Sequence, residues 1–386
     1  MELLLNPLFA VAVATLFLVL AVVVDLALGN RKVRWLDTIV PATGNLPKIS
    51  LIVAGRNEER NVEKAMRSLL AQDVPNFELI AVDDRSEDST GAILDRLAAQ
   101  EPRLRVIHVR DLPQGWLGKC HALQAGTERA SGEWLIFADA DIVMDGSVLR
   151  RAMAHAVEQK LDHLAVAPRI EMKGFLVNCF ASFFGMAFSS YFKPWKARDP
   201  NSDKYMGIGA FNMVRAEVYR KIGGHRPIAM RPDDDMMFGK LVKKNGFRQE
   251  VLFGGRLMSV EWYSSFRGMV GGLMKNSFSG TDYRVSMVVF ATAVHLICSA
   301  WPFAALFLTT GAVWGMNLAI VLALTAGSMD CARYFGLKAW RGIFYPVGCL
   351  VFFYIVWRAT WITLAHDGID WRGTHYSLKE LKANKV

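Results

Sequence analysis

Charged residues are scarce in this chain. They make up 21% of its 386 residues, whereas hydrophobic residues reach 52% and the mean hydropathy is +0.21. A soluble enzyme of this length usually carries more charge and less apolar surplus. Cysteine is scarce as well: the five cysteines form no CxxC pair and no metal-ligand spacing, so we expect reduced, structural thiols. The chain also lacks an interleaved basic-aromatic stripe, so we expect no nucleic-acid partner. Its net charge of +9 instead suits a domain that lies against anionic lipid.

The N-terminal apolar run, Leu3 to Leu28, has no basic residue before it. A signal peptide would carry positive charge ahead of its apolar stretch. Here the basic residues Arg31, Lys32 and Arg34 follow the run, which is long enough to cross a bilayer. This order favours a retained anchor over a cleaved signal, with the C-terminal side of the anchor in the cytoplasm. We therefore assign residues 1–30 to an N-terminal transmembrane anchor.

Two further apolar regions lie near the C-terminus, and the first, residues 287–329, is too long for one crossing. Its apolar pattern is interrupted near residues 309–311, which predicts a helical hairpin. The second covers residues 343–365, and basic residues between the two regions favour a cytoplasmic loop. We assign residues 287–365 to C-terminal transmembrane helices and residues 366–386 to a tail whose side of the membrane stays open. The basic residues are Arg333, Lys338 and Arg341.

Between these apolar ends, the chain reads as an ordinary globular domain. Short β-rich runs alternate with stretches in which apolar residues recur every three or four positions. This rhythm predicts an α/β fold with a mostly parallel sheet covered by helices on both faces. In such sheets, ligands bind beyond the carboxyl ends of the strands, and acidic clusters stand at those ends here. The predicted strands are residues 48–54, 77–82, 104–109 and 134–138; the predicted helices cover 62–70, 90–99 and 118–130.

The acidic pair Asp139 and Asp141 follows the last of these strands directly. Carboxylate oxygens are the ligands that Mg²⁺ or Mn²⁺ prefers, and such an ion can bridge a diphosphate and neutralise a leaving group. A single Asp-x-Asp motif is weak evidence, because a solvated turn has the same composition.

Two other acidic clusters have equally plain alternatives. Asp83 and Asp84 close a strand, where a carboxylate can accept hydrogen bonds from a nucleobase or ribose, but an Asx-type turn or helix N-cap explains them as well. Asp233, Asp234 and Asp235 precede an apolar helical run, where acids favour the helix dipole. Three adjacent carboxylates also repel one another, so we expect one to have a raised pKa, which a general base requires.

Taken together, the order and spacing of these clusters resemble the family 2 glycosyltransferases, which have the GT-A nucleotide-sugar fold. The resemblance covers Lys48 to Gly280 and, with membrane spans at both ends, is strongest to the lipid- and terpenoid-modifying branch: hopanoid-associated, carotenoid and ceramide glycosyltransferases. It implies a GT-A domain over residues 45–285 in a multi-pass protein of the bacterial inner membrane, with the catalytic domain in the cytoplasm. Further matching motifs are Arg56-Asn57-Glu58, Val82-Asp83-Asp84-Arg85-Ser86, Leu112 to Leu123, and Gly246 behind the third acidic cluster.

The resemblance also implies a role for each acidic residue. Asp84 would hold the base or ribose of a nucleotide-sugar donor, Asp139 would contact the nucleotide, and Asp141 would bind Mg²⁺ or Mn²⁺ on the diphosphate. Asp235 would be the catalytic base of an inverting transfer to a membrane lipid or terpenoid acceptor, and Asp234 would take the place of the family's glutamate. The matching motifs add Asn57, Glu58 and Lys119 to the donor-binding residues.

Two departures from the family pattern matter. Ala54-Gly55-Arg56 stands where the family usually has a proline, and the chain lacks the QxxRW-like motif of processive polysaccharide synthases. The second departure argues against a processive polymerase and leaves the cations for the diphosphate unassigned. Arg267 or Lys275 could supply them, or contact lipid phosphates instead. The tail motif Trp371-Arg372-Gly373 lies too far along the chain to take over this role.

Residues 174–195 are apolar and aromatic enough to span a membrane. One crossing would put Asp141 and Asp235 on opposite sides of the bilayer, although both must meet one donor. We therefore predict an interfacial helix, with a buried core helix as the alternative. The phenylalanines predicted to dip into lipid are Phe175, Phe180, Phe183, Phe184, Phe188 and Phe192.

Other functions remain open at this stage. A polyprenyl-phosphate sugar synthase would use the same donor chemistry with a phosphate nucleophile, which needs no deprotonation. A non-catalytic membrane scaffold could retain a degenerate transferase domain. Three intact acidic clusters favour an enzyme, because drift should erase at least one of them.

Overall fold

The computed structural model describes residues 7–263 and 265–386, so the first six residues of the predicted anchor lie outside the described part. The chain forms two compact units. The sheet unit comprises residues 33–170, 194–261 and 367–386. The helical unit comprises the described residues up to 32, together with residues 171–193 and 262–366. Both long excursions into the helical unit therefore start and end in the sheet unit.

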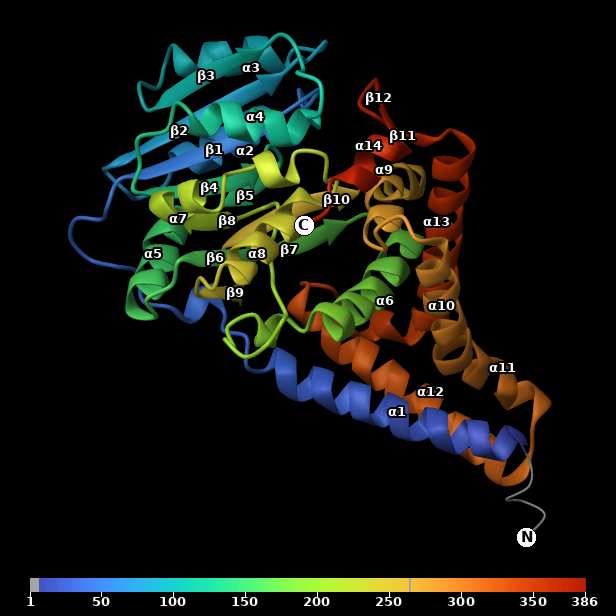
Figure 1. Ribbon diagram of the computed structural model, residues 1–386. Coiled ribbons are helices and arrows are strands. Elements are labelled where there is room, and N and C mark those ends of the chain that lie inside the picture. Colours follow the sequence, from blue (N-terminus) through green and yellow to red (C-terminus); the bar gives the residue numbers. More distant parts are fainter. Residues whose placement is uncertain (1–6, 264) are drawn as a thin grey trace. The chain divides into compact units, whose positions relative to one another are not determined.

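The sheet unit is built on seven strands in the order β3-β2-β1-β4-β8-β6-β9 (Figure 1). The four predicted strands are confirmed as β1 to β4, which are mutually parallel, and β8 is antiparallel to both its neighbours. The bounds are β1 Ile49–Gly55, β2 Phe77–Asp84, β3 Leu104–Val109, β4 Trp134–Asp139, β6 His163–Ala167, β8 Asn212–Arg215 and β9 Gln249–Phe253.

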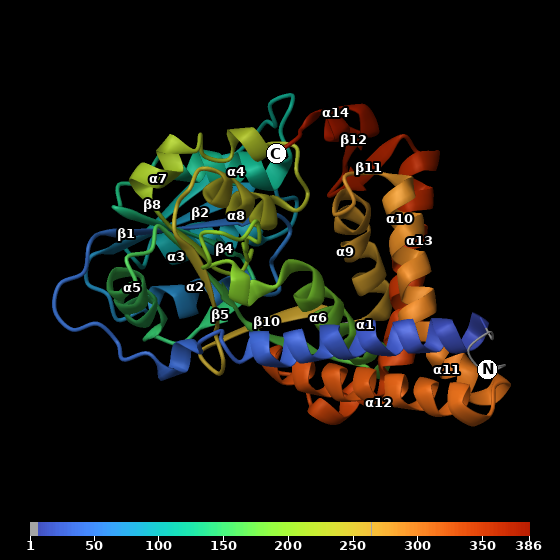
Figure 2. The ribbon, with the colours of Figure 1, turned by 60° about the horizontal axis from the view of Figure 1, so that its bottom comes forward.

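Both faces of this sheet are covered by helices, as the rhythm of the sequence predicts (Figure 2). On β1, Leu51 and Val53 belong to the core beneath α2, α3 and α5. On the other face, α4 approaches so closely that a Cβ on Gly126 would lie 2.6 Å from Ile52. The helices are α2 Val62–Leu70, α3 Thr90–Ala98, α4 Gly118–Thr127, α5 Val148–Glu158, α7 Ala216–Lys221 and α8 Asp234–Lys244.

The strand register fixes which residues meet at the carboxyl edge of the sheet. Gly55 at the end of β1 lies opposite Asp83 of β2, and Ala54 lies opposite Asp139 of β4. Two of the acidic clusters therefore flank the end of one central strand. A C-terminal hairpin with a short helix completes the unit, and β5, β10 and β7 form a separate three-stranded sheet. The bounds are β5 Ile142–Met144, β7 Arg169–Met172, β10 Met258–Tyr263, β11 Gly368–Trp371, β12 Thr374–Ser377 and α14 Leu378–Ala383.

The helical unit contains the predicted apolar segments. The predicted hairpin is confirmed: one arm passes from α10 through a π-helical turn into α11, the chain breaks at Thr309 and Thr310, and α12 forms the second arm. Helix α1 runs beside α12 in both views, and the ends of the two are joined by an ion pair between Arg31 and Asp330 (Figures 1 and 2). The helices are α1 Pro7–Asn30, α6 Phe175–Phe192, α9 Phe266–Ser279, α10 Val285–His295, α11 Trp301–Leu308, α12 Gly311–Tyr334 and α13 Tyr345–Ala365.

Among the described residues, five helical segments are long and apolar enough to cross a membrane, and α6 is in one of them. A single crossing by α6 is excluded, because it lies in sequence between β6 and β8, which are paired in one sheet. The prediction that all six phenylalanines of this segment dip into lipid is wrong, however. Phe180 and Phe183 are 1% and 0% exposed, because α6 packs along α12 and α13.

The second long excursion consists of residues 262–366. Both ends of this stretch join the sheet unit. Among its described residues, the stretch contains three segments long and apolar enough to cross a membrane. The C-terminal tail belongs to the sheet unit, as the acidic clusters do.

Candidate active site

Two loops at the carboxyl edge of the sheet hold each other in place. Ser86 Oγ accepts a hydrogen bond from the Asn57 amide at 3.0 Å, and Asn57 Oδ1 accepts one from the Glu87 amide at 2.9 Å. Asn57 and Arg85 both have a left-handed backbone, with φ of 55° and 56°. Such strained conformations persist where surrounding contacts enforce them, and they cluster at binding sites.

Within the second loop, the adjacent Asp83 and Asp84 make different contacts. Asp83 accepts a hydrogen bond from the Ser86 amide and contacts His108 Nδ1 at 3.0 Å, so the Asx-turn interpretation is correct for this residue. Asp84 is 5% exposed and receives both Nε and Nη2 of Arg85 in a bidentate pair. A Cβ on Gly118, the first residue of α4, would overlap the Asp84 carboxylate. Asp84 is therefore held against the N-terminus of α4, which favours negative charge.

Lys119 links the second acidic cluster to the third. Its Nζ donates to Asp139 Oδ1 at 2.8 Å and lies 3.7 Å from Asp234 Oδ2. Burial opposes the charge on this ammonium, but Asp139, Asp234 and Asp235 outweigh burial and hold the pKa of Lys119 well above its ordinary value. Lys119 is therefore a permanent cation between β4 and α8.

Asp141 lies two residues beyond the end of β4 and is half-buried. Burial, then the charges of Asp139 and Glu58, raises its pKa to about 7. Among the described residues, no three His, Cys, Asp or Glu side chains converge on one point. Mg²⁺ and Mn²⁺ do not need such a cage, because Mg²⁺ in particular is often held by one or two carboxylates together with substrate phosphates. The donor set of Asp141 and Asp139 fits such an ion.

The third cluster opens α8, and its members are also distinct. Asp233 makes no capping hydrogen bond. Its carboxylate instead accepts hydrogen bonds from Nη2 and Nε of the buried Arg231, at 2.8 and 2.9 Å. Asp235 accepts hydrogen bonds from the amides of Gly209 and Met236, both at 2.8 Å. Burial, followed by the charge of Asp234, raises the pKa of Asp235 to about 6, against a smaller opposing effect of Lys119. Asp235 thus meets the requirement for a base near neutral pH.

A loop before β8 brings Asp139 and Asp235 together. A Cβ on Gly209 would lie 2.9 Å from Asp139 Oδ2 and 3.4 Å from Asp235 Oδ2, and a Cβ on Gly207 would overlap the carbonyl oxygen of Asp235. Position 207 therefore requires glycine, and a side chain at position 209 would displace the Asp139 carboxylate. The sequence interpretation missed this loop, although paired glycines just before a buried strand are a signal of close backbone approach.

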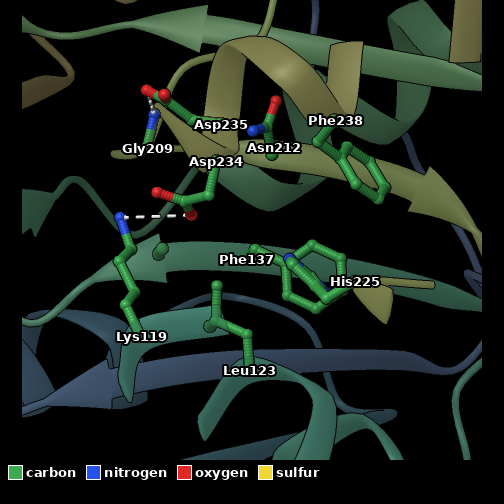
Figure 3. Close-up of a pocket in the computed structure, with 10 residues that line it drawn as sticks. Lys119, Leu123, Phe137, Gly209, Asn212, His225, Asp234, Asp235 and Phe238 are labelled. Carbon is green, nitrogen blue, oxygen red and sulfur yellow. Dashed lines mark hydrogen bonds and ion pairs between the residues drawn. The ribbon is translucent and has the colours of Figure 1, made fainter. Parts of the chain in front are cut away.

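Beneath these carboxylates, a small cavity has a neutral, aromatic floor (Figure 3). The ring of His225 lies 4.7 Å from that of Phe137 and stacks on Phe238 at 5.5 Å, and its Nδ1 contacts the Tyr219 hydroxyl. Burial, with a smaller effect of Lys119, lowers the pKa of His225 to about 3, so the ring is uncharged. In Figure 3, Asp234 faces Lys119 across the cavity mouth, while Asp235 faces Gly209.

Comparison with known families identifies this arrangement. The model of glycosyl transferase family 2 matches residues 50–223, which include the first two acidic clusters and the glycine loop. The chain carries a family 2 glycosyltransferase domain. The resemblance predicted from the motifs is thereby confirmed, and the sheet unit has the GT-A fold.

The chain is also similar to relatives with curated names, which are named for different products or acceptors. It is 29% identical over 194 residues to beta-monoglucosyldiacylglycerol synthase of Synechocystis sp., and these residues cover 49% of the chain but only 39% of that protein. It is 21% identical to 4,4'-diaponeurosporenoate glycosyltransferase of Staphylococcus aureus over 87% of the chain and 90% of that protein. A mannosyltransferase from Pyrobaculum calidifontis, solved with GDP-Man and Mn²⁺, shares the fold with a TM-score of 0.54 and 18% identity, covering 93% of the chain and 99% of that protein.

Two basic residues, Arg267 and Lys275, were considered as cations for the diphosphate. Arg267 and Lys275 lie on α9 of the helical unit, so the geometry of the sheet unit does not include them. The tail motif Trp371-Arg372-Gly373 belongs to the sheet unit despite its late position in the sequence. Within it, Arg372 pairs with Glu58 at 2.6 Å. A late position in the sequence therefore does not by itself separate the tail motif from the acidic clusters, because the chain returns to the sheet unit after α13.

Proposed function

We propose that this glycosyltransferase is an inverting enzyme that transfers a single sugar from a nucleotide-sugar to a hydroxyl group of a membrane lipid or terpenoid. The observation that carries the proposal is the convergence of three acidic clusters around Gly55 and Gly209. Asp84 and Asp139 close parallel strands at one edge of the sheet. Gly209 lies between Asp139 and Asp235, since a Cβ on this glycine would be 2.9 Å from Asp139 Oδ2 and 3.4 Å from Asp235 Oδ2.

The donor would lie across the ends of β1, β2 and β4. Asp84, held by Arg85, and the locked loop of Asn57 and Glu58 provide polar groups for the base and ribose. Asp141 would hold Mg²⁺ or Mn²⁺ on the diphosphate, and Asp139, which accepts a hydrogen bond from Lys119, would contact the nucleotide. When bound, such an ion neutralises charge that develops on the leaving nucleotide. The relative from Pyrobaculum was solved with a nucleotide-sugar and Mn²⁺, which supports this assignment.

Asp235 would remove the proton from the acceptor. In an inverting transfer, the hydroxyl oxygen attacks the sugar carbon opposite the nucleotide, and the carboxylate takes the hydroxyl proton as the new bond forms. Two backbone amides fix the Asp235 carboxylate, and its pKa of about 6 leaves it ionised yet basic near neutral pH. Asp234 and Lys119 would keep the site electrically balanced.

A lipid or terpenoid acceptor is supported by the apolar helices and by the relatives. One relative is named for a diacylglycerol product and the other for diaponeurosporenoate. Both long excursions from the sheet unit are apolar, and a bilayer would deliver the acceptor to the domain from which they start.

For the membrane arrangement, we infer three crossings: α1, the α10–α11 arm and α12. Basic residues follow both α1 and α12, which supports a cytoplasmic side for these ends by the positive-inside rule. The ion pair between Arg31 and Asp330 joins the same two ends. Because the tail shares the sheet unit, α13 would begin and end on the cytoplasmic side and would not cross.

The test is a transfer assay with membranes that contain the full-length protein. Membranes would be incubated with a panel of labelled nucleotide-sugars and Mn²⁺, and lipids would be extracted and separated. We expect label from one donor in a single neutral glycolipid, absent with excess chelator and absent with Asp141→Asn. Label in an acid-labile phosphate ester would show a polyprenyl-phosphate acceptor instead, and no label from any donor would refute the proposed function.

A further inference from the structure

The C-terminal hairpin presents Arg372 at a rigid tip. Strands β11 and β12 pair from Gly368 opposite Ser377 to Trp371 opposite Thr374, which leaves Arg372 and Gly373 as a two-residue turn. Both have a left-handed backbone, with φ of 49° and 77°, as a type I′ hairpin turn requires. The turn therefore fixes the direction in which the Arg372 side chain leaves the hairpin.

This tail is bound to the sheet unit at both of its ends. On the donor side, Tyr376 is buried and hydrogen-bonds to Arg85, the partner of Asp84. On the side of the base, Asn384 accepts a hydrogen bond from the Met230 amide and donates one to the Pro227 carbonyl, both at 2.9 Å. The tail therefore runs as a strap from the donor loops to the segment that leads into α8.

The guanidinium of Arg372 lies beside the predicted metal loop. Its Nη2 is 2.6 Å from Glu58 Oε1. Glu58 and Ala140 flank the same glycine: a Cβ on Gly55 would lie 3.7 Å from Glu58 Cγ and 3.2 Å from Ala140 Cβ. Ala140 is the residue between Asp139 and Asp141, so Arg372 is paired with a carboxylate that lies beside the Asp139–Asp141 turn.

Arg372 also differs from the other cations described at this edge. The side chains of Arg56, Arg85 and Lys119 are 10%, 18% and 23% exposed, and each is held by a carboxylate of the sheet unit. Arg372 is 39% exposed. An exposed ion pair contributes little stability, so Arg372 can exchange Glu58 for another anion at small cost. The planar guanidinium fork suits phosphate oxygens in particular.

From this geometry we propose that Arg372 binds the diphosphate of the donor, exchanging its contact with Glu58 for phosphate oxygens when the nucleotide enters. The inference rests on the proposed function, because it needs a nucleotide-sugar at this edge. It makes the tail strap part of the donor site, although the tail is separated from the other donor-site residues by the whole helical unit.

The experiment measures binding to the full-length protein in detergent, with UDP and GDP as probes and the matching nucleosides as references, all with Mn²⁺. For the diphosphate that the wild type binds, Arg372→Ala should weaken affinity about 10- to 100-fold, since a charge-assisted, bidentate contact is lost. Nucleoside affinity should change less than about twofold, and Arg372→Lys should be intermediate. Lys379→Ala, which removes one exposed charge from the same tail, is the matched control and should behave as wild type.

The outcomes separate the two proposals. If the wild type binds neither UDP nor GDP with Mn²⁺, the proposed function fails and the role of Arg372 fails with it. If the wild type binds a diphosphate and Arg372→Ala binds it equally well, only the role of Arg372 is refuted. Equal loss of diphosphate and nucleoside affinity would also refute it, because it would show that Arg372 merely shapes the base pocket. A thermal unfolding midpoint equal to wild type would establish that the variant is folded.

Discussion

Replacement of Asp235 by asparagine tests the proposed mechanism most directly. The change keeps the side-chain shape, and the amide oxygen can still accept one of the two backbone hydrogen bonds that fix the carboxylate. It removes the proton acceptor, however, and such acceptance is worth about 10²–10⁴-fold in rate, or about 3–5 kcal/mol of barrier. We expect turnover to fall by that factor at saturating donor. Donor affinity should change little, because the proposed donor-binding residues remain.

The dependence of turnover on pH gives a second readout for the same residue. With a pKa of about 6 for Asp235, about nine-tenths of the molecules carry the ionised base at pH 7 and about one-tenth at pH 5. Since only the ionised form accepts a proton, wild-type kcat should rise about tenfold between these pH values, and the residual rate of Asp235→Asn should not show this step. Asp234→Asn, with the same chemical change one position earlier, is the control and should cost less.

Two results would refute this reasoning. Near-normal turnover by Asp235→Asn would show that the base lies elsewhere or that the acceptor is a phosphate, which needs no base. A flat kcat profile between pH 5 and 7 in the wild type would show that Asp235 does not titrate during transfer. Labelled donor in a single-turnover measurement separates transfer from product release, so a slow release step cannot mask either result.

Three further predictions concern other parts of the molecule. A metal ion binds ionised carboxylates, and the pKa of Asp141 is about 7. The Mn²⁺ concentration for half-maximal activity should therefore fall with rising pH and level off above about pH 7. An equal Mn²⁺ requirement at pH 5.5 and 8 would count against Asp141 as ligand. Gly209→Ala should abolish most transfer without unfolding the protein, since its Cβ would meet Asp139 at 2.9 Å, whereas Gly271→Ala, which has open space around it, should be silent. A cysteine at Thr310 should react with an impermeant maleimide from outside intact cells and one at Lys379 only after the membrane is opened; labelling of both from outside would overturn the three-crossing arrangement.

Local patterns were sufficient for part of the fold. Strands β1 to β4 and the break at Thr309 follow from apolar periodicity and turn residues, which depend on neighbours in the sequence. Strands β6, β8 and β9 were not assigned. They are four or five residues long, shorter than β1 to β4, and so short an apolar run does not by itself distinguish a strand from part of a helix.

The site divides in the same way. The three acidic clusters were found because each stands at the end of a strand or the start of a helix, where a short motif is visible. The different roles of the aspartates were not predicted, because they depend on contacts that the short motifs do not show. Arg231 neutralises Asp233, and the Gly209 amide donates a hydrogen bond to Asp235. The contact between Arg372 and Glu58 joins residues 314 positions apart, and no local pattern predicts it.

The points at which the chain re-enters the sheet unit connect the apolar segments to the proposed chemistry. After α6, the chain returns at Pro194 and leads, through the stretch before β8, to the glycine loop beside Asp139 and Asp235. After α13, it returns at Asp367 and reaches Arg372 in the turn that directly follows β11. Residues beside the proposed base and beside the proposed diphosphate site thus each follow an apolar helix in the sequence. Each re-entry point therefore joins an apolar segment to one of the loops on which the proposed chemistry depends.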